Sequence, residues 1–473
     1  MKKVALHSLG CKVNSYETES MEQLFIKAGY EIVPFKDDVM ADVYVINTCS
    51  VTNIADRKSR QMLHKAKKMN KDAVVIACGC YVESDSAGVI ADECVDIVIG
   101  NNRKFSVVEA LEAYYNDSSC NVFMGEINKD QKYENLSIDT VSEHTRAYIK
   151  VQDGCNQFCS YCIIPYVRGR IRSREISDIV EEVKKLALKG FKEIVLTGIH
   201  ITSYGLDFVK KNDQGLKSDD YLEGNNNKKH IGLLDVIKAI HEIDGIERIR
   251  LSSLEPRVIT DEFARELQKL PKLCPHFHLS LQSGCDKTLK AMNRKYTTKE
   301  FMEGVQRLRK YLDNPALTTD VIVGFPGETD EDFYESYEFL KKVNFYEMHV
   351  FKYSRRKGTV ADKMPNQING KDKNKRSNSL LLMTKVNSIN YRKDFVKNTE
   401  LSDILVEELV EIDGKEYFTG LTKNYIRVAI EKDEFKDYSI INGMNSVINT
   451  IVNFRPVELL ADNETVLGKL VKL

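Results

Sequence analysis

The chain has 473 residues, of which 42% are hydrophobic and 29% are charged, and its formal net charge is −1. This composition is typical of a globular protein of about three domains, and it excludes a disordered or fibrous chain. The balance of charge also argues against a generally cationic nucleic-acid coat, so any site for a polyanion must be local.

The first hundred residues alternate short apolar runs with helical patterns. Alternation of buried strands and helices predicts an α/β domain with a doubly wound parallel sheet, which we place at residues 1–115. The predicted strands are Val4–Leu9, Asp42–Ile46, Ala73–Ala77 and Val95–Ile99, and the predicted helices are Ser15–Ala28 and Asn53–Met69.

A second alternating series covers residues 141–371 and contains six strand–helix units. Six units predict a partial (β/α)6 barrel rather than the full eight-stranded one. A polar stretch without periodicity follows Tyr204, and we interpret residues 205–230 as a long flexible insertion. The predicted strands are Ala147–Gln152, Glu193–Leu196, Arg248–Leu251, His276–Leu281, Thr319–Val323 and Tyr346–Phe351.

Residues 372–397 are basic and their pattern predicts a linker helix. After this segment the pattern changes to strand–turn–strand. The dipeptide Asp413-Gly414 is a strong hairpin signal, and the repeated short strands predict a small β-barrel at residues 398–462. Residues 398–473 hold 14 acidic and 8 basic side chains, so any RNA contact of this end must be local.

The chain has 11 cysteines. Its N-terminal sequence lacks a secretory pattern, and no apolar run approaches the ~20 residues of a membrane helix. We therefore expect a cytoplasmic protein without a membrane segment. In a reducing cytosol, cysteines are more often metal ligands or catalytic groups than disulfides.

Cys155, Cys159 and Cys162 form a C-x₃-C-x₂-C triplet just after the first strand of the second series. Three thiolates at this spacing can hold three irons of a [4Fe–4S] cluster, which leaves the fourth iron open to a substrate or cofactor. The alternative is a zinc site with a distant fourth ligand, but no partner stands at zinc-ribbon spacing. The spacing therefore favours an open cluster.

Three further cysteine positions follow successive strands of the first domain: Cys11, Cys49, and the pair Cys78 and Cys80. The carboxyl ends of parallel strands meet at one edge of a sheet, so these thiols are expected to converge there. The alternative is that they are small apolar residues packed in the core. Convergence favours a second cluster, and topology does not choose between Cys78 and Cys80.

With these motifs in place, the chain resembles the radical S-adenosylmethionine (SAM) methylthiotransferases over nearly its whole length. That family has an N-terminal methylthiotransferase domain, a radical SAM core and a C-terminal TRAM domain, which is OB-like. The motifs Ser8–Asn14 and Ile163–Arg170 are most similar to the branch that acts on N6-threonylcarbamoyladenosine in tRNA. The resemblance implies one cluster on Cys155, Cys159 and Cys162 and a second on Cys11, Cys49 and Cys80.

The resemblance implies transfer of a methylthio group to C2 of N6-threonylcarbamoyladenosine at position 37 of tRNA. Two [4Fe–4S] clusters would do the chemistry, with SAM as radical source and methyl donor and no catalytic residue beyond the clusters. The implied partners are tRNA, a small reducing protein such as flavodoxin or ferredoxin, and a source of sulfur. By similarity, the expected SAM contacts are Tyr161, Gly198, Glu255, Gln282 and Gly324.

Four arginines follow the triplet within seven residues, and a basic turn lies in the C-terminal region. Such a run is usually solvated, but beside an active site it can hold a phosphate backbone. We therefore predict RNA contacts at Arg168, Arg170, Arg172, Arg174, Lys423 and Arg427. Alternative substrates are isopentenyl-adenosine in tRNA or a ribosomal-protein aspartate, and the alternative of another class is a non-catalytic, zinc-stabilised RNA-binding protein.

Overall fold

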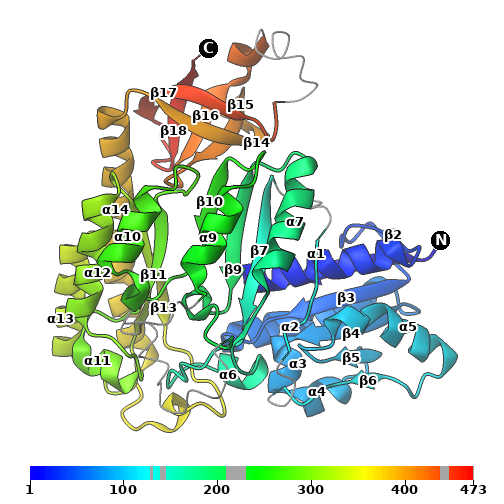
Figure 1. The fold of residues 1–473 in the computed structure, drawn as a ribbon. Coiled ribbons are helices and arrows are strands. Elements are labelled where there is room, and N and C mark those ends of the chain that lie inside the picture. Colours follow the sequence, from blue (N-terminus) through cyan, green and yellow to red (C-terminus); the bar gives the residue numbers. More distant parts are fainter. Residues whose placement is uncertain (128–131, 139–144, 209–230, 437–446, 472–473) are drawn as a thin grey trace.

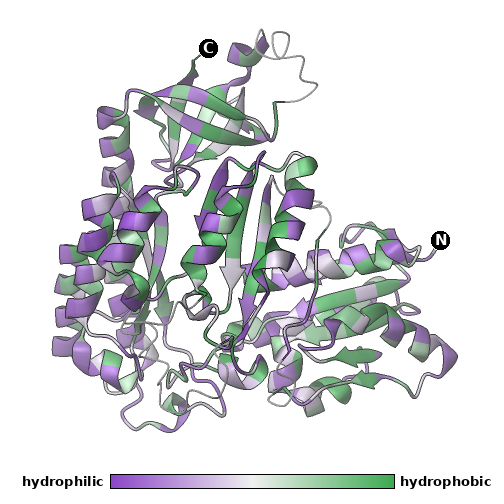
Figure 2. Ribbon diagram, in the orientation of Figure 1, coloured by the Kyte–Doolittle hydropathy of each residue, from purple (hydrophilic) through white to green (hydrophobic). Residues whose placement is uncertain are grey.

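The computed structural model describes residues 1–473 except 128–131, 139–144, 209–230, 437–446 and 472–473. Figure 1 shows the N-terminal sheet beside the lower part of a central barrel, with a small C-terminal barrel over the barrel's other end. Figure 2 shows hydrophobic residues concentrated on the strands, and hydrophilic residues on the outward faces of the helices. The predicted insertion falls largely on residues 209–230 and lies outside the described residues.

The N-terminal domain is a six-stranded parallel sheet of order β2-β1-β3-β4-β5-β6, with a hydrophobic cluster on each face. Every residue of β3 and β4 is buried, as expected for strands that helices cover on both sides. This confirms the doubly wound sheet, although β6 extends it past the predicted end at residue 115. The elements are β1 (Lys3–Ser8), α1 (Lys12–Lys27), β2 (Glu31–Ile32), β3 (Val43–Thr48), α2 (Asn53–Met69), β4 (Val74–Gly79), α3 (Cys80–Ser84), α4 (Ser86–Ile90), β5 (Ile97–Ile99), α5 (Val107–Asn116) and β6 (Val122–Phe123).

The central domain confirms the partial barrel of six parallel strands. They lie in two sheets, β10-β9-β7 and β11-β12-β13, and isolated bridges such as Leu254 to Leu279 join the sheets. The short strand β8 (Arg172–Ser173) is antiparallel to β7. The parallel strands are β7 (Arg146–Asp153), β9 (Glu193–Gly198), β10 (Arg248–Leu251), β11 (His276–Gln282), β12 (Ala316–Val323) and β13 (Glu347–Lys352).

Helices cover the outside of this barrel and enclose the largest hydrophobic cluster between themselves and the strands. Capping residues begin several of them; Thr297 accepts a hydrogen bond from the backbone of Glu300, whose carboxylate accepts one in return. The helices are α6 (Ile164–Val167), α7 (Ile176–Leu188), α9 (Leu233–His241), α10 (Asp261–Gln268), α11 (Asp286–Ala291), α12 (Thr298–Tyr311) and α13 (Asp330–Val343).

The 29-residue helix α14 (Gly370–Asn398) packs on β13 and leads into a closed barrel of order β14-β15-β16-β18-β17. This confirms the small β-domain, but β18 extends beyond the predicted end at residue 462 because Val466 and Leu470 fill the barrel core. None of the described helices is long and apolar enough to cross a membrane. The strands are β14 (Ser402–Ile412), β15 (Lys415–Thr422), β16 (Arg427–Glu431), β17 (Ile451–Leu459) and β18 (Thr465–Leu470).

Candidate active site

The loop that leaves β7 carries the first cysteine triplet, at the carboxyl end of the barrel. Gly154 has a φ of +70°, and a Cβ there would collide with the carbonyl oxygen of Arg170. Only glycine fits this turn, which folds the cysteine loop back on the segment that follows it. Cys155 N–H then donates to the Gly169 carbonyl at 3.0 Å.

The three thiols of this loop lie close enough to influence one another. Burial and the neighbouring Cys159 raise the pKa of Cys155 to about 12. Burial, Cys159 and Cys155 raise the pKa of Cys162 further above its usual range. The guanidinium of Arg294 donates to Cys159 Sγ at 3.3 Å. Buried thiols of this kind become thiolates when a metal binds them, so the donor set suits a metal cluster.

The second set of thiols lies at the carboxyl edge of the N-terminal sheet. Cys11 follows β1, Cys49 follows β3, and Cys80 is the first residue of α3 after β4. A Cβ on Gly10 would lie 2.7 Å from Cys49 Sγ, so that sulfur rests directly on the backbone beside Cys11. Burial, Cys80 and Cys11 together raise the pKa of Cys49 to about 11. The structure thus brings these three cysteines together.

Cys78 and Cys80 occupy different environments. Cys78 is fully buried within the hydrophobic cluster on one face of the sheet, and its thiol donates to the Ile46 carbonyl at 3.7 Å. Cys80 instead packs against residues of the central domain, and its sulfur accepts a hydrogen bond from Arg168 Nε at 3.3 Å. Cys80 is therefore the one that faces the barrel.

Arg168 sits at the centre of a buried network that joins the two domains. Its guanidinium donates to Glu17 at 2.9 Å, to Asn14 at 2.7 Å and to Asp153 at 3.1 Å. Glu17 also pairs with Lys104 and Lys150 at 2.9 and 2.7 Å. Burial alone would raise the pKa of Glu17, but these three cations hold it well below its usual range. The network places the loops of both triplets next to each other.

The residues predicted to contact SAM lie at the carboxyl ends of separate strands. Tyr161 meets the ring of Phe325 edge-on at 6.5 Å between centroids. Gly324 has a φ of +70° and donates its N–H to Glu328 at 2.6 Å. Gln282 ends β11 with a φ of +74°, an uncommon value for a residue with a Cβ. Tyr161 belongs to the cysteine loop itself, and its contact with Phe325 joins that loop to the segment that follows β12.

Gly198 and Glu255 complete that predicted set. A Cβ on Gly198 would lie 2.8 Å from the Gln152 carbonyl, so β9 and β7 approach closely there. Glu255 is buried, 3.3 Å from His200 Nε2 and in contact with Arg257. Burial would raise its pKa, but His200 and Arg257 lower the pKa of Glu255 to about 2. It is a fixed anion at the mouth of the barrel.

The predicted RNA contacts at Arg168, Arg172 and Arg174 are wrong, because all three side chains are buried. Arg174 pairs with Glu182, and Arg172 lies 3.4 Å from Asp153. The arginine run therefore serves internal ion pairs. Arg170 is the exception: it is exposed, and its guanidinium lies over the Phe158 ring at 4.5 Å.

The turn that carries Lys423 joins the C-terminal barrel to the central one, and the RNA contact at this half-exposed lysine stays a prediction. Lys423 Nζ donates to the Pro271 carbonyl at 3.3 Å, and its own carbonyl accepts from Arg250 at 3.0 Å. The adjacent Tyr425 stacks on His276 with ring centroids 4.7 Å apart. Arg427 remains exposed, paired with Glu408 at 3.1 Å.

Sequence reasoning missed Glu17, Lys150, Asp153 and Arg294, which hold the two cysteine loops. Arg294 lies 135 residues from Cys159, and Glu17 lies 151 residues from Arg168. Glu17 is an ordinary helical glutamate by pattern, so no local signal marks it. Asp153 could have been used to predict such a partner, because it ends a buried strand and a buried carboxylate needs a cation beside it.

Comparison with known proteins identifies the family of the chain. Residues 149–340 match the Radical SAM superfamily, and residues 3–100 match the Uncharacterized protein family UPF0004. The threonylcarbamoyladenosine tRNA methylthiotransferase MtaB of Bacillus subtilis (strain 168) is 40% identical over 92% of this chain and 91% of that protein. A tRNA-2-methylthio-N(6)-dimethylallyladenosine synthase of Sulfurihydrogenibium is 36% identical over 89% and 91%.

Similarity to a solved structure supports the fold and no further property. The radical SAM methyltransferase TsrM from Kitasatospora setae superposes with a TM-score of 0.54 and 14% identity, over 76% of this chain and 77% of that one.

Proposed function

The chain belongs to the radical SAM tRNA methylthiotransferases, and on this premise we propose that it transfers a methylthio group to C2 of N6-threonylcarbamoyladenosine at position 37 of tRNA. Membership implies one [4Fe–4S] cluster and SAM. The proposal adds a second [4Fe–4S] cluster and the choice of nucleoside. One observation carries it: two cysteine triplets from two domains, joined through the contact of Arg168 with Cys80.

Both donor sets fit a cluster. Each offers three thiols, which leaves one iron without a protein ligand, and each has an arginine N–H on one sulfur, Arg294 on Cys159 and Arg168 on Cys80. When bound, the clusters supply the electron that cleaves SAM to a radical able to attack an unactivated C–H bond, and the sulfur that is inserted. The protein supplies orientation and shielding.

The remaining residues would hold SAM. Gly198 and Gly324 would contribute backbone groups at the ends of β9 and β12; a Cβ at either position would collide with the protein itself, with the Gln152 carbonyl oxygen at 2.8 Å and with the Lys373 side chain at 2.3 Å. Tyr161, against Phe325, offers an aromatic surface for the adenine. Glu255 stays ionised near neutral pH and can accept hydrogen bonds from amino or hydroxyl groups, as can the amide oxygen of Gln282.

The choice of nucleoside has separate support. A relative that covers almost the whole chain carries the threonylcarbamoyladenosine name, and the Lys12-Val13 pair after Cys11 is similar to that branch. The protein reductant, of flavodoxin or ferredoxin type, and the sulfur source are further parts of this proposal. Isopentenyl-adenosine in tRNA is the second candidate, because relatives with the dimethylallyladenosine name also cover the chain.

The test is anaerobic reconstitution followed by iron and sulfide analysis and mass spectrometry of nucleosides from tRNA incubated with SAM. We expect two clusters per chain and formation of the 2-methylthio derivative of N6-threonylcarbamoyladenosine. One zinc and no iron would reject the enzyme in favour of an RNA-binding protein. Conversion of isopentenyl-adenosine alone would reject the choice of nucleoside.

A further inference from the structure

The segment that follows β13, residues 353–364, lies against the loop of the first cysteine triplet. The N–H of Ala361 donates to the carbonyl oxygen of Ser160, the residue directly after Cys159, at 2.7 Å. Tyr161 of the same loop packs against the small hydrophobic cluster to which Ala361 belongs. Figure 1 shows the segment in yellow at the lower end of the barrel. The exposed residues of this segment are therefore close to the thiols of the first triplet.

The same segment reaches the second triplet through Arg356. The guanidinium of this buried residue donates to the hydroxyl of Ser50 at 2.5 Å and to the side chain of Asn53 at 3.0 Å. It also forms an ion pair with Asp56. Ser50 directly follows Cys49, and Asn53 is the first residue of α2. These contacts hold the start of α2 against the segment, so the exposed residues of both form one surface beside the two triplets.

The exposed side chains of this surface are of two kinds. Three are aliphatic and more than half exposed. Three are exposed cations, for which no ion pair is found in the part of the chain that the structure describes. We call the six residues the junction surface: Val51, Ile54, Val360, Arg57, Lys58 and Lys357. Mixed apolar and charged side chains are typical of a protein–protein interface, whereas a phosphate backbone is bound by cations and hydrogen-bond donors.

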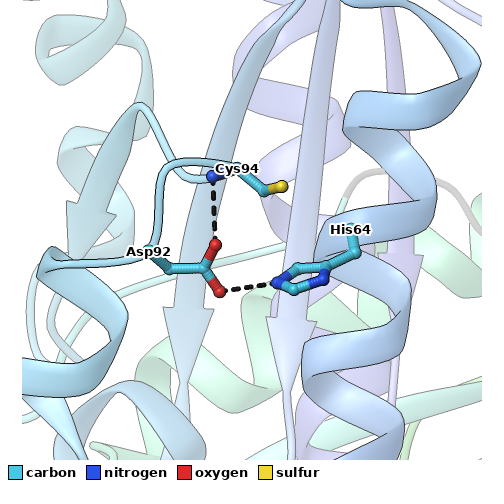
Figure 3. A group of neighbouring side chains, drawn as sticks. All are labelled: His64, Asp92 and Cys94. Carbon is cyan, nitrogen blue, oxygen red and sulfur yellow. Dashed lines mark hydrogen bonds and ion pairs between the residues drawn. The ribbon is translucent and has the colours of Figure 1, made fainter.

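The second half of α2 contacts its own domain instead. Lys67 pairs with Asp96 at 2.8 Å, and His64 Nε2 lies 2.8 Å from Asp92 Oδ2, as Figure 3 shows. Lys68 is exposed in this half, about 15 Å beyond Lys58 along the helix. It therefore gives a control position on the same helix, away from the junction surface.

We infer that the junction surface is the docking site of the protein that supplies the electron for SAM cleavage, an acidic one-electron carrier of flavodoxin or ferredoxin type. The inference rests on the proposed function and deepens it, because that function needs an external reductant and leaves its docking place open. The reduced carrier loses one electron and the cluster of the first triplet gains it, and no bond forms or breaks in this step. Docking on residues 353–364 gives the electron a short path, and opposite charges speed the encounter.

The first experiment measures binding of a recombinant acidic flavodoxin to the reconstituted full-length protein by anaerobic titration calorimetry. The double variant Lys58→Glu/Lys357→Glu should weaken binding by at least about tenfold, because it places two negative charges opposite an acidic partner. Val360→Asp should have an effect in the same direction, since it removes an apolar contact and adds a like charge. Lys68→Glu, the matched control, should bind flavodoxin as the wild type does.

A second readout separates docking from chemistry. Dithionite is a small reductant that needs no docking site, so with dithionite the double variant should form 5′-deoxyadenosine at the wild-type rate. With reduced flavodoxin below saturation as the only reductant, its rate should fall by the same factor as its affinity for flavodoxin. Higher salt should narrow the difference from the wild type, because it screens the charges.

Unchanged affinity for flavodoxin in both the double variant and Val360→Asp would overturn the inference. A larger loss of affinity for tRNA than for flavodoxin would also overturn it, because the surface would then belong to the phosphate backbone. Failure of the proposed function would look different, since the wild-type protein would then not modify tRNA even with dithionite.

Discussion

Arg168 Nε lies 3.3 Å from Cys80 Sγ, which places a guanidinium of the central domain on a thiol of the N-terminal domain. The other nitrogens of Arg168 are taken by Glu17, Asn14 and Asp153. A buried charge with this many partners holds one conformation. The spacing of the two domains at the site is thus fixed by a side chain that also touches a proposed cluster ligand.

Replacing Arg168 should therefore affect both stability and the second cluster. Arg168→Ala leaves Glu17 and Asp153 with fewer cations, and we expect a loss of about 3–5 kcal/mol of stability, measured by thermal unfolding. Arg168→Lys keeps a positive charge but loses the Nε–H donor to sulfur. It should fold and show a lower reduction potential for the second cluster, measured by redox titration with electron paramagnetic resonance. An unchanged potential in Arg168→Lys would show that the contact does not tune the cluster.

Substitutions in the two cysteine triplets should impair different steps of the reaction. Cys159→Ala should abolish SAM cleavage, measured as 5′-deoxyadenosine formation. Cys80→Ala should retain cleavage but stop methylthio transfer, because only the second cluster loses a ligand. Cys78→Ala, the matched control in the sheet core, should keep both activities and lose about 1 kcal/mol of stability. If Cys78→Ala is the variant that loses transfer, the assignment of Cys80 is incorrect.

Buried and exposed arginines of the 168–174 run should respond differently. Arg174→Ala breaks the buried pair with Glu182, so we expect a loss of about 3–5 kcal/mol of stability with no change in the salt dependence of tRNA binding. Arg170→Ala, at the exposed position, should leave stability nearly unchanged and lower the slope of log affinity against log salt by about one. A reduced slope in Arg174→Ala would mean that this side chain reaches phosphate after all.

His349 should titrate above its ordinary value. Its pKa is raised from 6.5, mainly by the hydrogen bond to Asp320, with burial opposing. Since the folded pKa is the higher one, the stabilising contribution is present below pH 6.5 and is lost as pH rises through the raised value. Asp320→Asn should return the pKa of His349 toward its usual range, measured by NMR of ¹³C-labelled histidine. The same titration in both proteins would contradict the assigned pairing.

Much of the architecture could be predicted because its signals are local. The helix Asn53–Met69 begins and ends as expected, and the strands before Cys11, Cys49 and Cys80 are visible as apolar runs that a cysteine follows closely. The edge where those cysteines meet follows from the topology of a parallel sheet.

The features that the sequence did not predict concern charged side chains, and they have a common cause. A run such as Arg168 to Arg174 is typical of solvated side chains, because the sequence does not show which distant carboxylates it pairs with. Glu17 lies 151 residues from Arg168, and only the packing of α1 on β7 brings it there. The contacts of Lys423 with Arg250 and Pro271 could not be predicted for the same reason, because these partners belong to another domain.

Part of the contact between the small barrel and the central barrel uses the main chain of the small barrel. Arg248 and Arg250 donate to the carbonyl oxygens of Leu421, Thr422 and Lys423, groups that no substitution removes. Substitution of these three residues would therefore leave the acceptors of Arg248 and Arg250 in place. The side chains of this turn can thus change over evolution while these three hydrogen bonds are kept.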